Sequence, residues 1–172
     1  MPIYALGELT PHIDATAFIH PDAVIIGSVT IGAESSIWPG AILRGDNGKI
    51  LVGSQTSIQD CAVIHCNSRF NTTIGNRCVI GHGVHLEGCT VNDLSLIGSH
   101  AVVLEGAEVG PVALVGAHAL VSNHKKVPSR ARALGVPATI TLDVISESDI
   151  EPSVEVYVRN SHWYRQNLKR ID

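Results

Sequence analysis

The sequence is poor in aromatic and charged residues. Only 4% of its 172 residues are aromatic and 16% are charged, whereas 45% are hydrophobic. A hydrophobic fraction this high excludes a disordered chain, and the scarcity of rings excludes a core built on large aromatic side chains. The length fits a single domain.

The sequence also lacks a block of basic residues, and its formal net charge is −4. We therefore expect no nucleic-acid partner, because such partners require clustered positive charge. No uninterrupted apolar run is long enough to cross a bilayer, so we expect no membrane partner either. Residues 1–9 lack the basic and apolar segments of a secretory signal, which predicts a cytoplasmic protein.

The chain has four cysteines, and none of them forms a CxxC pair. Disulfide bonds are rare in the cytoplasm, where thiols are kept reduced. We therefore expect these cysteines to be packing residues and not a disulfide framework or a CxxC-type metal site.

Aliphatic residues recur every six positions, interrupted by three shifts of phase. Each of the eighteen positions in this series is Ile, Leu or Val, and glycine follows seven of them. A six-residue unit cannot bury an apolar face alone, whereas stacked units bury one continuous core. Three units per turn predict an all-β fold, a parallel β-helix of about six triangular coils. The series is Ile13, Ile19, Ile25, Ile31, Ile37, Leu43, Val52, Ile58, Ile64, Ile74, Ile80, Leu86, Val91, Ile97, Val103, Val109, Val115 and Val121.

The repeat is expected to end at Val121. A polar loop over residues 122–132, a turn over 135–138 and a short strand should follow. Ser148 and Glu151 match a capping box, and helical spacing of apolar residues predicts one α-helix over about 150–170, packed along the coil. We expect a β-helix domain with its following loop over 1–145, and the helix of the same domain over 146–172. Trp38 is expected to fill a subunit contact.

Three polar residues follow core positions that begin the third face of successive coils. They are Arg44, His65 and Glu87. Because neighbouring strands lie roughly 4.7–4.9 Å apart, stacked side chains can share one metal ion at roughly 2.0–2.2 Å each. His65 and Glu87 form such a pair. His82 lies on the second face and could reach the same ion only across a subunit boundary.

The chain resembles the gamma-class carbonic anhydrase family of hexapeptide-repeat proteins over nearly its whole length. The resemblance rests on IWPGAILRGDNGKILVGSQTSIQDCAVIHC, on IGHGVHLEGC, and on GVPA followed by a C-terminal helix. It implies a left-handed β-helix that assembles as a homotrimer. It further implies a divalent metal ion between subunits, for which zinc is the expected metal.

The family uses three histidine ligands, and this chain departs from that pattern at one of them. Two ligands match His65 and His82, the latter from the neighbouring subunit, whereas the third position is Glu87. Zinc accepts a His₂Glu set in catalytic sites. His85 as the third ligand, after a local strand shift, and a site without a tightly bound metal are the alternatives. Because a carboxylate lowers the positive charge of the site, we expect CO₂ hydration to be weak or lost.

The resemblance implies roles for five further residues. Gln59 would orient the water or bicarbonate, and Tyr164 would contact the substrate. Arg44 and Asp60 would form an ion pair between subunits, with Asp46 beside them. The acidic loop that serves as a proton shuttle in well-known members is missing from this sequence.

The favoured function is therefore a metal-dependent lyase that interconverts CO₂ and bicarbonate. One alternative is an acyl-CoA thioesterase or acyltransferase, whose phosphate-binding groove would use the basic residues between 125 and 132. Another is a non-catalytic trimer that serves as a scaffold or binds a small ligand. Measuring the metal content distinguishes the non-catalytic trimer from the two enzymes. Parallel assays of CO₂ hydration and of thioester hydrolysis distinguish the lyase from the acyl-CoA enzyme.

Overall fold

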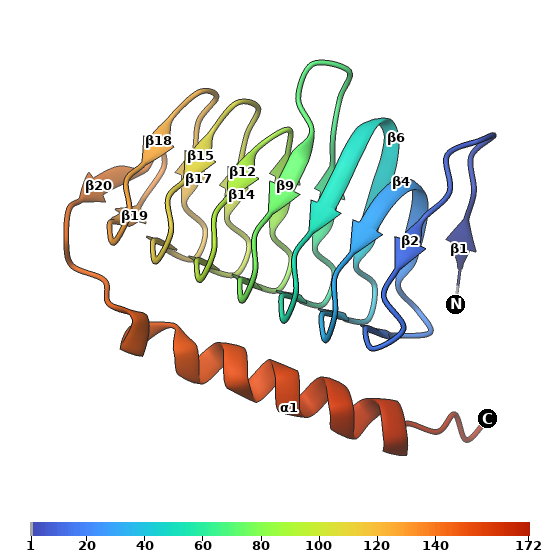
Figure 1. The fold of residues 1–172 in the computed structure, drawn as a ribbon. Coiled ribbons are helices and arrows are strands. Elements are labelled where there is room, and N and C mark those ends of the chain that lie inside the picture. Colours follow the sequence, from blue (N-terminus) through green and yellow to red (C-terminus); the bar gives the residue numbers. More distant parts are fainter. Residues whose placement is uncertain (1) are drawn as a thin grey trace.

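The computed structural model describes residues 2–172 as a stack of β-coils with one long helix along its side (Figure 1). Strands of successive coils pair in parallel, so that Ile25 pairs with Leu43 and Leu43 pairs with Ile64. The predicted parallel β-helix with a C-terminal helix is confirmed.

One face of the coil is an eight-stranded sheet. Seven of its strands run parallel, one from each coil, so the solenoid has about seven turns. The eighth strand pairs antiparallel to its neighbour and ends the sheet. The strands are β3 (Phe18–Ile19), β5 (Ser36–Ile37), β7 (Ser57–Ile58), β10 (Val79–Ile80), β13 (Leu96–Ile97), β16 (Leu114–Val115), β19 (Arg132–Leu134) and β20 (Thr139–Thr141).

The other two faces form one twelve-stranded sheet, because β4 and β6 are long enough to turn the corner between them. The first part of β6 and the two strands stacked after it, β8 and β11, carry most of the candidate site. The twelve strands are β1 (Ile3–Tyr4), β2 (His12–Ile13), β4 (Val24–Ile31), β6 (Ile42–Val52), β8 (Val63–His65), β9 (Thr72–Ile74), β11 (His85–Glu87), β12 (Thr90–Val91), β14 (Val102–Val103), β15 (Glu108–Val109), β17 (Leu120–Val121) and β18 (Lys126–Val127).

The core is the interior of the coil. All the repeat positions identified in the sequence are buried except Ile13, which is partly exposed on the first coil. Small buried residues such as Ala41, Ala62 and Ala101 lie between these aliphatic side chains. The six-residue spacing therefore predicts the core because each unit turns one aliphatic side chain inward.

The coil continues for one more turn beyond Val121, and the predicted loop over 122–132 is wrong. This segment contains β18 and the start of β19, and Val127 and Ala133 are buried in the core. Both residues keep the six-residue spacing, but Ala133 is small and most of the residues between them are polar. The predicted turn over 135–138 and the short strand after it are present.

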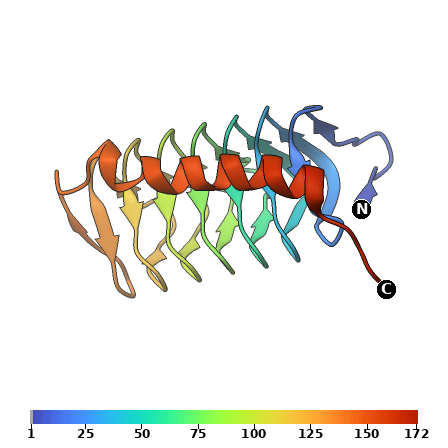
Figure 2. The ribbon, with the colours of Figure 1, turned by 90° about the horizontal axis from the view of Figure 1, so that it is seen from below.

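Helix α1 (Glu151–Asn167) lies along the eight-stranded sheet (Figure 2). Ile150 and Val154 are buried against Val79 of that sheet. The capping box forms between Ser146 and Asp149, around the short 3₁₀ helix η1 (Glu147–Asp149), and not at the predicted Ser148–Glu151. Within residues 2–172, no helix combines the length and the apolar character that a membrane span needs.

The C-terminal helix covers Trp38, and the expectation of a subunit contact there is corrected. The indole is 5% exposed, with ring centroids 5.7 Å from Tyr157 and 5.0 Å from Tyr164, both on α1. Its Nε1 donates to Ser57 Oγ at 2.9 Å. Trp38 therefore anchors the helix on the coil within one chain.

Candidate metal centre

His65 and Glu87 lie side by side on the outer surface of the twelve-stranded sheet. Strands β8 and β11 pair so that Glu87 stands opposite His65. The His65 Nδ1 atom is 3.2 Å from Glu87 Oε1, and both side chains are partly buried. The structure brings this pair together as the repeat spacing predicts.

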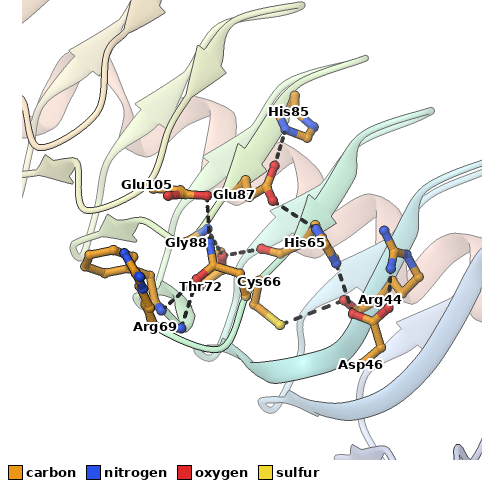
Figure 3. Close-up of polar contacts among 12 residues, drawn as sticks. Arg44, Asp46, His65, Cys66, Arg69, Thr72, His85, Glu87, Gly88 and Glu105 are labelled. Carbon is orange, nitrogen blue, oxygen red and sulfur yellow. Dashed lines mark hydrogen bonds and ion pairs between the residues drawn. The ribbon is translucent and has the colours of Figure 1, made fainter.

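Asp46 and Arg44 extend this contact along the sheet (Figure 3). Asp46 Oδ1 is 3.0 Å from His65 Nε2, and the Arg44 guanidinium contacts the other Asp46 oxygen. Burial opposes the charged form of Asp46, but the hydrogen bonds with His65 and Arg44 outweigh it and lower the pKa of this carboxyl. A Cβ at Gly45 would lie 2.5 Å from the Ser28 carbonyl oxygen, so only glycine fits between Arg44 and Asp46.

His85 occupies the other side of Glu87. Its Nε2 atom is 3.3 Å from Glu87 Oε2, the oxygen that does not face His65. Strands β8 and β11 pair without a break through His85, Leu86 and Glu87. The local strand shift required by the alternative placement of His85 as third ligand is therefore not observed.

His82 and Asp60 form a second imidazole–carboxylate pair. His82 follows β10 of the eight-stranded sheet, and its Nδ1 is 2.9 Å from Asp60 Oδ2. Its side chain is 50% exposed. Within the chain, His82 belongs to a different sheet from His65, as predicted.

Gln59 and Tyr164 lie toward the helix and not beside His65. Gln59 is buried near Tyr157, whose pKa is raised mainly by burial and also by the Asp60 charge. Tyr164 packs against Phe18, with ring centroids 6.0 Å apart. The roles of Gln59 and Tyr164 toward a substrate stay predictions.

The expected ion pair between Arg44 and Asp60 does not form inside one chain. Arg44 contacts Asp46, and Asp60 contacts His82. The pair was expected between subunits, and in that form it stays a prediction.

The donor chemistry at His65 fits a divalent cation. A neutral imidazole donates from one nitrogen only, yet each ring nitrogen of His65 faces a carboxylate oxygen. Either the ring carries two protons, or a cation replaces the proton between Nδ1 and Glu87. Imidazole ligands of metals usually place their second nitrogen on a carboxylate, as His65 does with Asp46 and His82 does with Asp60.

A single chain provides only part of such a site. Among residues 2–172, no three His, Cys, Asp or Glu side chains are grouped so that they could hold a metal ion. Cys66, next to His65, points into the core, and burial raises the pKa of its thiol.

His85 was expected only as an alternative third ligand, and its contact with Glu87 was not predicted. Residues two apart on a strand face the same side of a sheet, so the spacing of His85 and Glu87 already indicated that they are neighbours. Asn67 was missed as well. Its amide donates to Glu105 Oε1 at 2.8 Å and ties the loop after His65 to the next coils.

Residues 10–45 match the family described as "Bacterial transferase hexapeptide (six repeats)". The chain is 48% identical over 125 residues to a "Probable carbonic anhydrase" of Methanocaldococcus jannaschii, covering 73% of this chain and 79% of that protein. It is 37% identical to the carnitine operon protein CaiE of Escherichia coli, covering 98% of this chain and 80% of that protein.

Two solved structures share the whole architecture. A Bacillus cereus protein assigned as an acetyltransferase has a TM-score of 0.93 at 33% identity, over 95% of this chain and 96% of that chain. A hexapeptide transferase family protein from Anaplasma phagocytophilum has a TM-score of 0.90 at 34% identity, over 95% of this chain and 98% of that chain. These similarities define a family whose members carry different activity names.

Proposed function

Because this chain belongs to the gamma-class carbonic anhydrase-like family of hexapeptide-repeat proteins, we propose that it is a metal-dependent hydratase that interconverts CO₂ and bicarbonate. The observation that carries the proposal is the contact between His65 and Glu87 on paired strands. In this proposal, His65 and Glu87 of one subunit and His82 of a neighbour hold the ion. Zinc suits a set of two imidazoles and one carboxylate.

The carboxylates of the site would fix the ligands before an ion binds. Asp46 accepts a hydrogen bond from His65 Nε2 and leaves Nδ1 facing Glu87. Asp60 accepts from His82 Nδ1 and leaves Nε2 as the nitrogen that would bind an ion. A divalent metal at this position would supply Lewis-acid activation of water. Glu87 adds a negative charge to the site, and this charge favours a low rate of CO₂ hydration.

An apolar surface around the site supports a homotrimer. The outward residues next to the polar column are mostly aliphatic, and Ile42 and Val63 are both 37% exposed. Contiguous apolar patches of this kind mark interaction sites. A contact between this face and the neighbour's corner that carries His82 joins unlike surfaces, and such contacts form a ring when the rotation between neighbouring subunits closes. We therefore propose that three subunits share three metal sites.

Complementation between two inactive variants tests this arrangement. His65→Ala and His82→Ala should each lose the metal while remaining trimeric. When the two variants are co-expressed and mixed trimers are isolated through two different tags, about one third of the sites, one in each mixed trimer, should combine an intact His65 with an intact His82. Metal content by elemental analysis and CO₂ hydration by stopped-flow should both return to about that fraction.

Two results would overturn the proposed shared metal site. One is a parent protein that takes up no divalent metal when zinc or cobalt is supplied during purification. The other is a set of mixed trimers that regain neither metal nor activity. If the parent binds metal at the shared site but does not hydrate CO₂, the proposed metal site is supported and the proposed hydratase activity is refuted.

Acyl transfer is the second candidate, favoured by the similarity to a protein assigned as an acetyltransferase. The basic residues considered for phosphate binding are divided between faces. Lys126 lies on β18 of the twelve-stranded sheet, 3.4 Å from Glu108, whereas Arg132 lies on β19 of the eight-stranded sheet. This separation disfavours a single basic groove that could bind the phosphates of an acyl-CoA substrate. Acetyl-CoA hydrolysis, measured beside CO₂ hydration on the same trimer, distinguishes the two functions.

A further inference from the structure

His85 interrupts a row of outward aliphatic side chains. Strand pairing places the row across six coils, with His85 between Val63 and Val102. The other members are also aliphatic: Val24, Ile42 and Leu120. An aliphatic residue would suit the proposed subunit contact, so the imidazole at this one position has a different role.

The only polar contact that His85 makes among the described side chains is with Glu87. Its Nε2 lies 3.3 Å from Oε2, while Oε1 lies 3.2 Å from His65 Nδ1. The two oxygens of one carboxylate are therefore each held by a different imidazole. Figure 3 shows Glu87 between these two rings.

A glutamate at this position needs such a contact more than a histidine would. Its carboxylate is set by three side-chain torsions, whereas an imidazole is set by two, so glutamate has more orientations to lose. The partly exposed position of Glu87 leaves room for the side chain to turn toward solvent. A hydrogen bond to Oε2 restricts both the swing of the side chain and the rotation of the carboxylate.

We propose that His85 is a positioning residue that orients Glu87, so that Oε1 is presented toward His65 and the shared metal. This inference rests on the proposed function, and it assigns His85 a role other than ligation. It predicts that His85 affects metal binding only through Glu87. Where the metal is absent, it predicts that His85 still fixes the orientation of the Glu87 carboxylate.

Cobalt titration of the trimer tests the role. His85→Ala should weaken Co²⁺ binding by about 10–100-fold, the usual effect of losing a group that orients a ligand. It should also alter the visible absorption band of bound Co²⁺. His85→Gln, whose amide can donate to Oε2, should recover part of the affinity. His12→Ala is the matched control, because His12 is exposed on β2 of a different face.

A double-mutant cycle separates positioning from ligation. In a Glu87→His background, removal of His85 should change Co²⁺ affinity by less than about twofold, because the carboxylate that it orients is gone. An equal loss in both backgrounds would show that His85 acts independently of Glu87 and would overturn the inference. Unchanged affinity and an unchanged spectrum in His85→Ala would also overturn it.

Metal-free crystals of the parent and of His85→Ala provide a readout that does not need the metal. Glu87 should face His65 in the parent and turn away from it in the variant. The same Glu87 orientation in both crystals would overturn the positioning role. A parent that binds no Co²⁺ but shows the expected reorientation would refute the proposed metal site while leaving the orienting contact intact.

Discussion

The His65 imidazole and the Glu87 carboxylate face each other across paired strands, with Nδ1 3.2 Å from Oε1. The contact places a negative charge at the position where the family resemblance implies a third imidazole. The Glu87 carboxylate therefore lowers the net positive charge of the proposed metal site. The first prediction tests the effect of that charge on the reaction.

Glu87→His should raise CO₂ hydration. Replacing the carboxylate by a neutral imidazole increases the net positive charge of the site, which favours ionisation of water by the metal. We expect kcat/KM to rise by about tenfold, or roughly 1.4 kcal/mol of transition-state stabilisation. Stopped-flow hydration at equal metal content is the measurement. Glu108→His, on β15 of the other face, is the control. If Glu87→His is no faster than the parent, the carboxylate is not what limits the reaction.

Asp46→Asn should destabilise the protein at neutral pH but not in acid. Hydrogen bonds with His65 and Arg44 outweigh the effect of burial and lower the pKa of Asp46. A lowered pKa stabilises the folded state above the unfolded value of about 3.9, and this contribution is lost as the pH falls through the lowered value. We expect the variant to lose roughly 1 kcal/mol at pH 7.

Urea unfolding of the parent and of Asp46→Asn at pH 7 and near pH 3 measures this difference. The gap between the two curves should close at the lower pH. Asp143→Asn, in an exposed segment after β20, serves as the control and should show no such gap. A gap that persists undiminished in acid would show that the charge of Asp46 is not the source of its stabilising effect.

Trp38→Ala should reduce the free energy of unfolding far more than Trp163→Ala. Trp38 is 5% exposed and packs between the coil and α1, whereas Trp163 is 60% exposed. Truncating a buried aromatic residue costs about 3–5 kcal/mol, whereas exposed substitutions usually change stability by about 0.5 kcal/mol or less. Chemical denaturation of both variants provides the comparison. Similar losses in the two variants would contradict the anchoring role of Trp38.

Cys78 and Cys89 should resist thiol reagents in the native protein. Burial raises the pKa of each to about 12, so neither forms the reactive thiolate near pH 8.5. Cys61 is exposed and provides the internal comparison. Mass spectrometry after brief labelling should find Cys78 and Cys89 unmodified until denaturant is added. If Cys78 is labelled as fast as Cys61, the coil around Cys78 opens readily in the native protein.

The repeat made the interior of the coil predictable from the sequence, but not its end. Ile25, Ile58 and Val103 are fully buried where the six-residue spacing places them. The last turn was missed because Ala133 breaks the run of larger aliphatic residues while still pointing inward. The capping box was expected two residues too late, because Ser146 and not Ser148 forms it, although the helix itself begins at Glu151, close to the expected residue 150.

The candidate site was predictable to the extent that it depends on strand register. The spacing places His65 beside Glu87, because residues in equivalent positions of successive coils stack. The spacing does not show that both His65 nitrogens face carboxylates, nor that His85 holds the second oxygen of Glu87. Those contacts depend on side-chain torsions, which a periodic pattern does not specify.

The sequence by itself determined the stacked coil, its aliphatic interior and the column of polar side chains, because the six-residue spacing of the inward aliphatic residues fixes which of their neighbours point outward. The tertiary structure decided that α1 covers Trp38 and that Asp60 faces His82. It also decided which oxygen of Glu87 faces which imidazole. These features arise where segments that are distant in the sequence meet. The repeat alone allows several arrangements of the helix and of the side chains, and the free energy of packing and hydrogen bonding selects one of them.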